Sequence, residues 1–184
     1  MSTPKILETR ELARSRFFRI EEMDLRFANG VERTYERIPA QGRDAVIVVP
    51  VTAAGEVLLI REYAAGFHEI QLSLPKGAAE KGEDVCTAAE RELREEIGFG
   101  AKRLQFLKNL SIAPGHMGFT INVVLATELF AARIPGDEPE PPEVVAWPMD
   151  QLEGLMSNPQ FGEARAVAAL WLAQMALANA KTTS

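Results

Sequence analysis

The 184-residue chain is poor in the residues that build disulfide or zinc frameworks: it has one cysteine, Cys86, and two histidines, His68 and His116. A single cysteine excludes an intrachain disulfide framework, and so few histidines argue against a histidine-rich zinc site. The sequence also lacks an N-terminal apolar signal region and any apolar run long enough to span a membrane. We therefore expect a cytoplasmic protein that has no membrane partner.

The chain also has no excess of positive charge. The formal net charge is −6 at pH 7, which argues against general electrostatic binding to nucleic acid. An anionic substrate would need local help from cations. Hydrophobic residues make up 47% and charged residues 25% of the chain, as in ordinary globular proteins. The length is that of about one domain with a sizeable core.

The most informative run in the sequence is GAAEKGEDVCTAAERELREEIGF, residues 77–99. It matches the pattern G-x5-E-x7-R-E-U-x-E-E-x-G-U, where U is aliphatic, at every fixed position except the last. At that last position Phe99 replaces an aliphatic residue. Asp84 is placed to cap a helix, and Gly98 is placed to end it. Gly77 opens the preceding loop, where the backbone must approach a metal or a phosphate closely.

Glu92, Glu95 and Glu96 lie at i, i+3 and i+4, so the predicted helix places them on one side. They repel one another and crowd the helix C-terminal end, where the macrodipole disfavours anions. Cations would offset this charge, and hard carboxylate oxygens suit Mg²⁺ or Mn²⁺. Taken alone, the three residues are equally consistent with a solvated acidic helix end.

The rest of the chain predicts mostly strands. Residues 1–10 are expected to be irregular, and 15–38 to form two strands joined at Asn29-Gly30, a strong hairpin signal. A final long helix is expected over 159–180, with Asn158 as its cap. Further strands are expected at 45–51, 57–60, 70–74, 104–112, 119–125 and 143–147, and a short helix at 150–156.

The run at 77–99 resembles the Nudix box, the signature of hydrolases that act on nucleoside diphosphates linked to another moiety. The similarity extends over nearly the whole chain, to the ADP-ribose pyrophosphatase branch and, within it, to the ADP compounds hydrolases. The segments that carry it include ARSRFF, ANGVERTYER, SLPKG and GDEPEPPEVVAWP. The resemblance implies an α/β (α+β) protein: an α/β/α sandwich around a mixed sheet, with an N-terminal antiparallel hairpin.

The same resemblance implies a division of the chain into two parts. Residues 1–42 would form a β-hairpin subdomain for dimerisation and substrate contact, and residues 43–184 would form the hydrolase domain. A homodimer that exchanges N-terminal elements is expected. The implied activity is Mg²⁺-dependent cleavage of ADP-ribose, diadenosine polyphosphates and NADH, releasing AMP, with Mn²⁺ as a possible substitute.

Roles for individual residues also follow from the resemblance. Arg91 would hold the glutamates in position, and Glu138, in the acidic loop, would take the proton from the attacking water. Without the resemblance, that proline-rich loop would be interpreted as a solvated loop. The expected metal ligands are Glu92, Glu96, Glu140 and the backbone carbonyl of Lys76. Glu95 is expected to be a further ligand or a catalytic residue that orients the site. The expected substrate contacts are Arg61, Lys76, Tyr35, Phe18 and Pro114.

Two departures affect the choice of substrate. Many ADP-ribose pyrophosphatases carry E-x-P-A-G before the box, whereas here Ser73 and Lys76 replace the glutamate and the alanine. Lys76 is expected either to bind an additional phosphate, as a mobile point charge, or to be an exposed loop lysine. The alternatives are a hydrolase of GDP-sugars or nucleoside triphosphates, and a non-catalytic nucleotide sensor.

Overall fold

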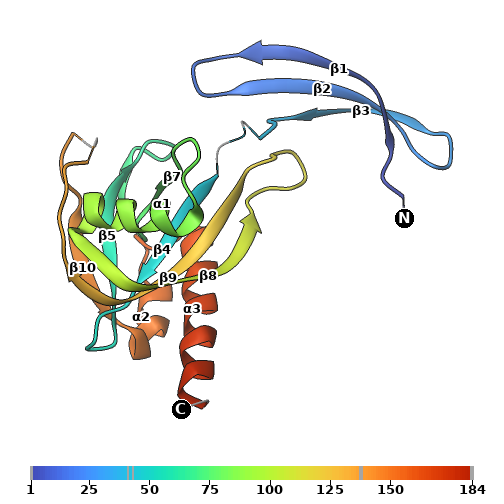
Figure 1. Cartoon of the computed structure of the whole chain (residues 1–184). Helices are drawn as coiled ribbons and strands as arrows, with labels where there is room; N and C mark the ends of the chain where they lie inside the picture. Colours follow the sequence, from blue (N-terminus) through green and yellow to red (C-terminus); the bar gives the residue numbers. More distant parts are fainter. Residues whose placement is uncertain (1, 41, 43, 137–138, 183–184) are drawn as a thin grey trace. The chain divides into compact units, whose positions relative to one another are not determined.

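The structure is a computed structural model that describes residues 2–40, 42, 44–136 and 139–182. The chain forms two compact units (Figure 1). The first contains Met1–Gly42 and Ser111–Thr120, and the second contains Arg43–Leu110 and Ile121–Ser184. Among the described residues, no helix combines the length and the apolar character needed to cross a membrane.

The first unit is built on a three-stranded antiparallel sheet in the order β1-β2-β3. Its strands are β1 (Lys5–Arg14), β2 (Arg19–Arg26) and β3 (Glu32–Arg37). The predicted hairpin is present as β2–β3, and Gly30 takes the positive φ of 83° that its turn requires. The prediction of an irregular start was wrong, because residues 5–10 belong to β1.

Strand β1 pairs with β2 along its whole length and carries mostly charged side chains, so it has no regular apolar alternation that would predict a strand. Arg10 forms ion pairs with Glu22 and Asp24 of β2, each at 2.7 Å. Thr34 of β3 donates a hydrogen bond of 2.7 Å to the same Asp24. These residues share one polar face of the sheet, because opposed and alternate residues in a strand pair point the same way.

The opposite face of this sheet carries apolar side chains beside charged ones. The register places Ile6 opposite Leu25, and Met23 opposite Tyr35. Glu21 lies on the same face, where Arg19 and Arg37 each pair with it at 3.0 Å. Ile6 and Tyr35 are nevertheless about half exposed, at 52% and 45%. The unit therefore carries apolar side chains that its own fold does not bury.

The segment Ser111–Thr120 belongs to this first unit through backbone bonds with Ile38. The Ile38 N–H donates to the His116 carbonyl, and the Gly118 N–H donates to the Ile38 carbonyl, both at 2.9 Å. Pro114, one of the predicted substrate contacts, is an exposed residue of this segment.

The second unit contains two sheets, in the orders β7-β4-β9-β8 and β10-β5-β6. The first is mixed, because β4 pairs parallel with β9 and antiparallel with β7. The second is antiparallel. The strands are β4 (Ala45–Pro50), β5 (Glu56–Ala64), β6 (Glu69–Ser73), β7 (Lys76–Ala78), β8 (Phe99–Ser111), β9 (Thr120–Ala131) and β10 (Glu143–Pro148).

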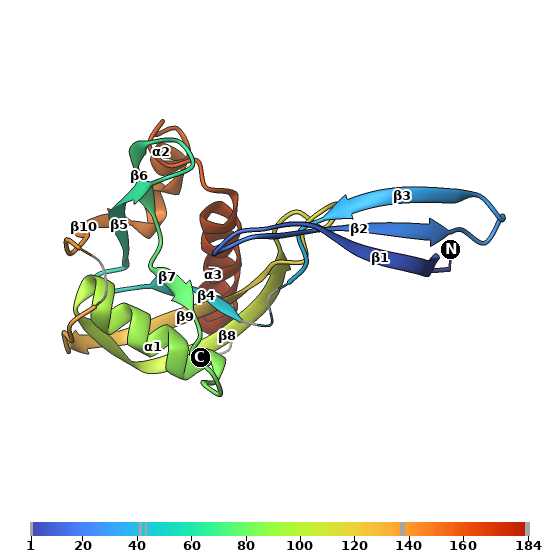
Figure 2. The ribbon, with the colours of Figure 1, turned by 90° about the horizontal axis from the view of Figure 1, so that it is seen from above.

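Helices cover both faces of the mixed sheet. They are α1 (Val85–Glu92), continued by a π-helical turn (Leu93–Ile97); a 3₁₀ turn (Met149–Gln151) that leads into α2 (Leu152–Met156); and α3 (Ala164–Thr182). Figure 2 shows α1 and α3 on opposite sides of strands β4 and β9.

Alternation along β4 explains this layering, since successive residues of a strand point to opposite faces. Val48 joins the core that contains Ala89 and Leu93 of the α1 side, whereas Ile47 joins the core that contains Leu170 of α3. Strand β4 is therefore apolar at every position. The predicted α/β/α arrangement around a mixed sheet is confirmed.

The predicted start of the last helix at Pro159 was wrong, because α3 begins at Ala164. Asn158 organises a turn instead. Its carbonyl accepts from the Phe161 N–H at 3.0 Å, and its side chain accepts from the Gln160 N–H at 2.9 Å. This turn delivers Phe161, which is only 3% exposed, into the core. Burying an aromatic ring outweighs five more residues of helix.

Candidate active site

Helix α1 begins as its sequence predicts. The Asp84 carboxylate accepts hydrogen bonds from the N–H groups of Cys86 and Thr87, at 2.9 and 3.2 Å, and these bonds lower the pKa of Asp84. Its bond with the Thr87 hydroxyl is the largest cause of that shift. The helix ends at Gly98, whose φ of 78° places it in the left-handed region.

The last turn of this helix is wider than expected. The Gly98 N–H bonds to the Leu93 carbonyl, five residues earlier, as in a π-helix. Single π-turns of this kind are frequent at functional sites. The turn includes Glu95 and Glu96, so it sets the direction of two of the three clustered carboxylates.

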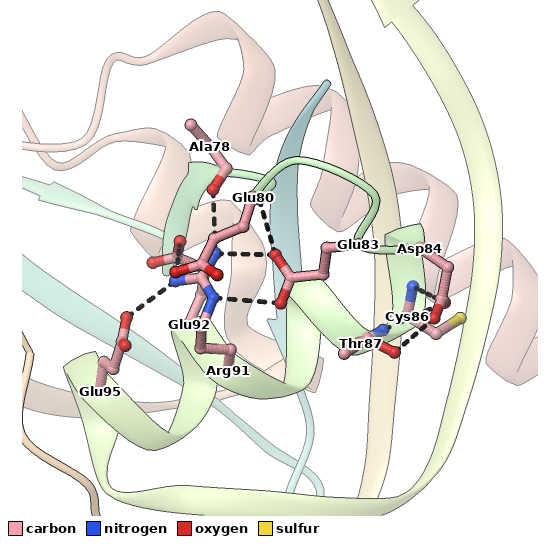
Figure 3. A network of polar contacts seen from close by, with 9 residues as sticks. All are labelled: Ala78, Glu80, Glu83, Asp84, Cys86, Thr87, Arg91, Glu92 and Glu95. Atoms are coloured by element: carbon pink, nitrogen blue, oxygen red, sulfur yellow. Dashed lines mark hydrogen bonds and ion pairs between the residues drawn. The ribbon is translucent and has the colours of Figure 1, made fainter. Parts of the chain in front are cut away.

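Arg91 is the centre of a network of polar contacts (Figure 3). Its Nη1 donates to Glu92 and to Glu95, both at 2.9 Å. The Nε and Nη2 atoms donate to the two oxygens of Glu83, at 3.1 and 3.2 Å. Nη2 also donates to the Ala78 carbonyl at 2.9 Å. One guanidinium thus joins three carboxylates to the loop before the helix.

Glu83 links the same network to the loop backbone. Its carboxylate accepts from the Glu80 N–H at 2.8 Å. Burial alone would raise the pKa of Glu83, but the bonds from Arg91 and from the Glu80 N–H outweigh it and lower that pKa. Glu83 therefore stays ionised and, with Arg91, fixes the loop that precedes α1.

Glu92 and Glu96 are buried, with exposed fractions of 7% and 8%. The backbone N–H of Lys76 donates to Glu96 Oε2 at 3.0 Å. Glu92 lies against Gly77: a Cβ atom on that glycine would lie 2.1 Å from Glu92 Oε1. The glycine is therefore required for the backbone to approach this carboxylate so closely.

Burial raises the pKa of Glu96 to about 8. The N–H of Lys76 opposes this rise, and the nearby charge of Glu92 adds to it. A buried carboxylate beside a second one is costly as an anion unless a cation compensates it. This pair is the part of the structure that fits a divalent cation, since its ligands would be hard oxygens.

The carboxylates do not form a ready-made cage. Among the described residues, no three acidic, histidine or cysteine side chains converge closely enough to hold a metal ion. Arg91 explains part of this arrangement, because it binds Glu92 and Glu95 directly. Glu138, the predicted base, lies outside the described residues. Glu140, a predicted ligand, is exposed and lies in the part of the acidic loop that leads into β10.

Sequence reasoning missed a second polar cluster beside this one. The Lys76 ammonium donates to Glu62 of β5 and, at 3.0 Å, to Ser73 of β6. The Lys76 side chain is 17% exposed, so it is not the exposed loop lysine weighed as one alternative. The two departures from the E-x-P-A-G pattern, Ser73 and Lys76, thus contact each other. No pattern along the sequence predicts this contact, because it joins side chains from three different strands.

Three other predicted substrate contacts, Arg61, Phe18 and Tyr35, are not members of this cluster. Arg61 of β5 donates to Gln160 at 2.7 Å and pairs with Glu143 at 3.5 Å, within the second unit. Phe18 and Tyr35 are exposed residues of the first unit. Their rings are therefore accessible to a ligand.

The chain belongs to the Nudix hydrolase family, because the model of the NUDIX domain matches residues 42–179. The model of the NudE-type Nudix hydrolase N-terminal domain matches residues 4–37. Both matches confirm the resemblance predicted from the box and from the N-terminal segments. Enzymes of this family generally need divalent metal ions.

Several known proteins are similar to the chain over much of its length. It is 46% identical to ADP compounds hydrolase NudE of Escherichia coli (strain K12) over 172 residues, covering 94% of this chain and 92% of that protein. It is 31% identical to an ADP-ribose pyrophosphatase of Bacillus subtilis (strain 168), covering 68% and 69%. A crystal structure of ADP compounds hydrolase aligns with a TM-score of 0.92 at 45% identity, covering 97% of this chain and 96% of that one.

Proposed function

We propose that this protein hydrolyses the pyrophosphate linkage of ADP compounds, with Mg²⁺ as its metal and AMP as a product. ADP-ribose, diadenosine polyphosphates and NADH are the proposed substrates. The observation that carries this proposal is the pair of buried carboxylates, Glu92 and Glu96, in the last turns of the α1 region, with Gly77 packed against Glu92. The similarity to ADP compounds hydrolase NudE along nearly the whole chain supports the ADP moiety.

Glu92, Glu96, Glu95 and the Lys76 carbonyl would hold the metal, with Glu140 as a further ligand. When bound, Mg²⁺ neutralises phosphate charge and lowers the pKa of water. Arg91 keeps Glu92 and Glu95 oriented through its two bonds of 2.9 Å. We assign the general base to Glu138 because the acidic loop resembles that of the family, and proton removal from the attacking water needs a carboxylate.

The proposed substrate contacts offer different kinds of interaction. Arg61 offers a planar guanidinium for phosphate or carboxylate-like oxygens. Phe18 and Tyr35 offer exposed rings on which adenine would stack. Pro114 is proposed as a contact on the similarity to ADP-ribose pyrophosphatases, and no interaction of its own supports it.

A substrate panel with product analysis tests the proposed function. ADP-ribose, diadenosine triphosphate and NADH should each release AMP in the presence of Mg²⁺, with kcat/KM values well above those for GDP-sugars and nucleoside triphosphates. A panel in which GDP-sugars or nucleoside triphosphates reacted much faster would overturn the ADP assignment. Binding of nucleotides without turnover would instead favour a sensor.

We also propose a homodimer formed through the first unit. Strands β1 and β3 are exposed along nearly their whole length, and the half-exposed Ile6 lies opposite Leu25 on the face that also carries Met23. A small sheet needs a partner surface for such a face. A second copy of the chain would supply it symmetrically.

Ile6→Glu should convert the dimer to a monomer at micromolar concentration, because it places a charge on that face, opposite Leu25. Ala13→Glu is the matched control: it adds the same charge to the same strand, but opposite Ile20, on the other face. Light scattering coupled to size exclusion measures both. A wild-type protein that is already monomeric would contradict the dimer, as would equal effects of the two variants.

A further inference from the structure

The Lys76 side chain joins the two sheets of the second unit. Lys76 lies in β7, a three-residue edge strand of the β7-β4-β9-β8 sheet. Its ammonium contacts Glu62 of β5 and Ser73 of β6, which belong to the β10-β5-β6 sheet. This short edge strand is therefore anchored by a side chain as well as by its pairing with β4.

The backbone of the same residue supports the site. Its N–H donates to Glu96 Oε2 at 3.0 Å, and the next residue, Gly77, lies directly against Glu92. A shift of Lys76 along the edge of the sheet would move both supports together. Displacement of a site by about 1 Å is enough to reduce turnover by about 100-fold.

The surroundings of the ammonium argue against a role in counting substrate phosphates. The Lys76 side chain is 17% exposed and its charge is compensated by Glu62, whose own side chain is 30% exposed. A phosphate-binding lysine works as a flexible, hydrated point charge. Here the ammonium would have to leave a partly buried ion pair, which is strongly unfavourable for the carboxylate left behind.

We propose that Glu62 is a positioning residue of the active site. It acts through the Lys76 ammonium, with Ser73 as second acceptor, to fix β7 and thereby the N–H that holds Glu96. This inference rests on the proposed function, because it treats Glu96 as part of the hydrolytic site. It assigns the side chain of Lys76 to the support of the carboxylates and not to substrate choice.

The test compares Glu62→Gln, Lys76→Met and the double variant with two matched controls. Glu69→Gln removes a carboxylate from the same sheet, and Lys81→Met removes an exposed lysine of the loop before α1. The measurements are kcat and KM for ADP-ribose and diadenosine triphosphate, and the Kd of Mn²⁺ by electron paramagnetic resonance without substrate. Thermal unfolding checks that each variant is folded.

Each single variant should lower kcat by about 10-fold and weaken Mn²⁺ binding by a similar factor, as removal of a supporting partner typically does. KM should change little, and the losses should be equal for the two substrates. The double variant should be no worse than either single one, because both break the same contact. Lys76→Arg, which keeps the ion pair, should restore most of the activity, and both controls should behave as wild type.

Three results would overturn the proposal. The first is a Glu62→Gln enzyme with wild-type kcat and Mn²⁺ affinity, and the second is a double variant in which the losses of kcat from the two single variants multiply. The third is a loss of kcat from Lys76→Met that is confined to diadenosine triphosphate. The last result would show that Lys76 reads phosphate number. If Glu62→Gln fails to fold, Ser73→Ala decides in its place, since it removes only one acceptor of the ammonium. A wild-type protein that binds Mn²⁺ but cleaves no ADP compound would contradict the proposed function and leave the positioning role standing on Mn²⁺ affinity.

Discussion

Glu96→Gln is expected to lower kcat for ADP-ribose by about 1,000-fold while the protein remains folded. Glu96 is buried beside Glu92, and a carboxylate in this position is the strongest candidate to ligate the metal. Loss of a ligand removes several kcal/mol of transition-state stabilisation, and each 1.4 kcal/mol corresponds to about a tenfold change in rate.

The glutamine keeps the shape and can still accept the hydrogen bond from the Lys76 N–H. It also removes the need to bury a charge, so the unfolding temperature should stay the same or rise. Glu90→Gln, a neutralisation in the same helix at a variable position of the box, serves as the control and should retain wild-type kcat. A Glu96→Gln enzyme whose kcat is within tenfold of the wild-type value would show that this carboxylate does not ligate the metal.

Gly77→Ala is the second substitution with a large expected effect, and we expect kcat/KM to fall by about 100-fold. The added Cβ would lie 2.1 Å from Oε1 and 2.3 Å from Cδ of Glu92, so the carboxylate must move. Arg91 also holds that carboxylate, at 2.9 Å, which limits the directions in which it can shift. Misplacement of a site group by about 1 Å costs about this factor in rate.

Gly66→Ala is the matched control, because a Cβ at Gly66 would meet nothing within 4 Å. It should leave kcat/KM unchanged. Steady-state kinetics with ADP-ribose, together with the Kd of Mn²⁺, separates displaced ligands from a general loss of structure. Wild-type values for Gly77→Ala would mean that Glu92 rearranges freely and that its observed position is not needed for turnover.

The sequence predicted those parts of the fold that depend on neighbouring residues. Asp84 and Gly98 marked both ends of the α1 region, because capping and left-handed glycines act locally. The continuous apolar run of β4 predicted a strand covered on both faces. The start of α3 was mispredicted, since Asn158 and Pro159 favour a helix start locally, whereas burial of Phe161 in the core requires a turn.

The candidate site also has features that depend on neighbouring residues and others that depend on how distant strands pack. The spacing of Glu92, Glu95 and Glu96 predicted that they lie on one side of the helix, and the resemblance to the Nudix box predicted that Arg91 would hold the glutamates. Arg91 contacts Glu92 and Glu95, whereas Glu96 accepts a hydrogen bond from the Lys76 N–H. The contact of Lys76 with Glu62 and Ser73 depends on the arrangement of three strands, so no pattern along the chain could show it. Strand β1 was missed because its mostly charged sequence has no regular apolar alternation, although it pairs with β2 along its whole length.

Removal and return of the metal shows whether this protein hydrolyses an ADP compound in a metal-dependent reaction. Purified protein is incubated with ADP-ribose in Mg²⁺, in excess EDTA, and in EDTA followed by an excess of Mg²⁺, and the products are separated by chromatography. We predict AMP and ribose 5-phosphate in the first sample, no turnover in the second and full recovery in the third. Undiminished turnover in EDTA, or no AMP under any of the three conditions, would contradict the account.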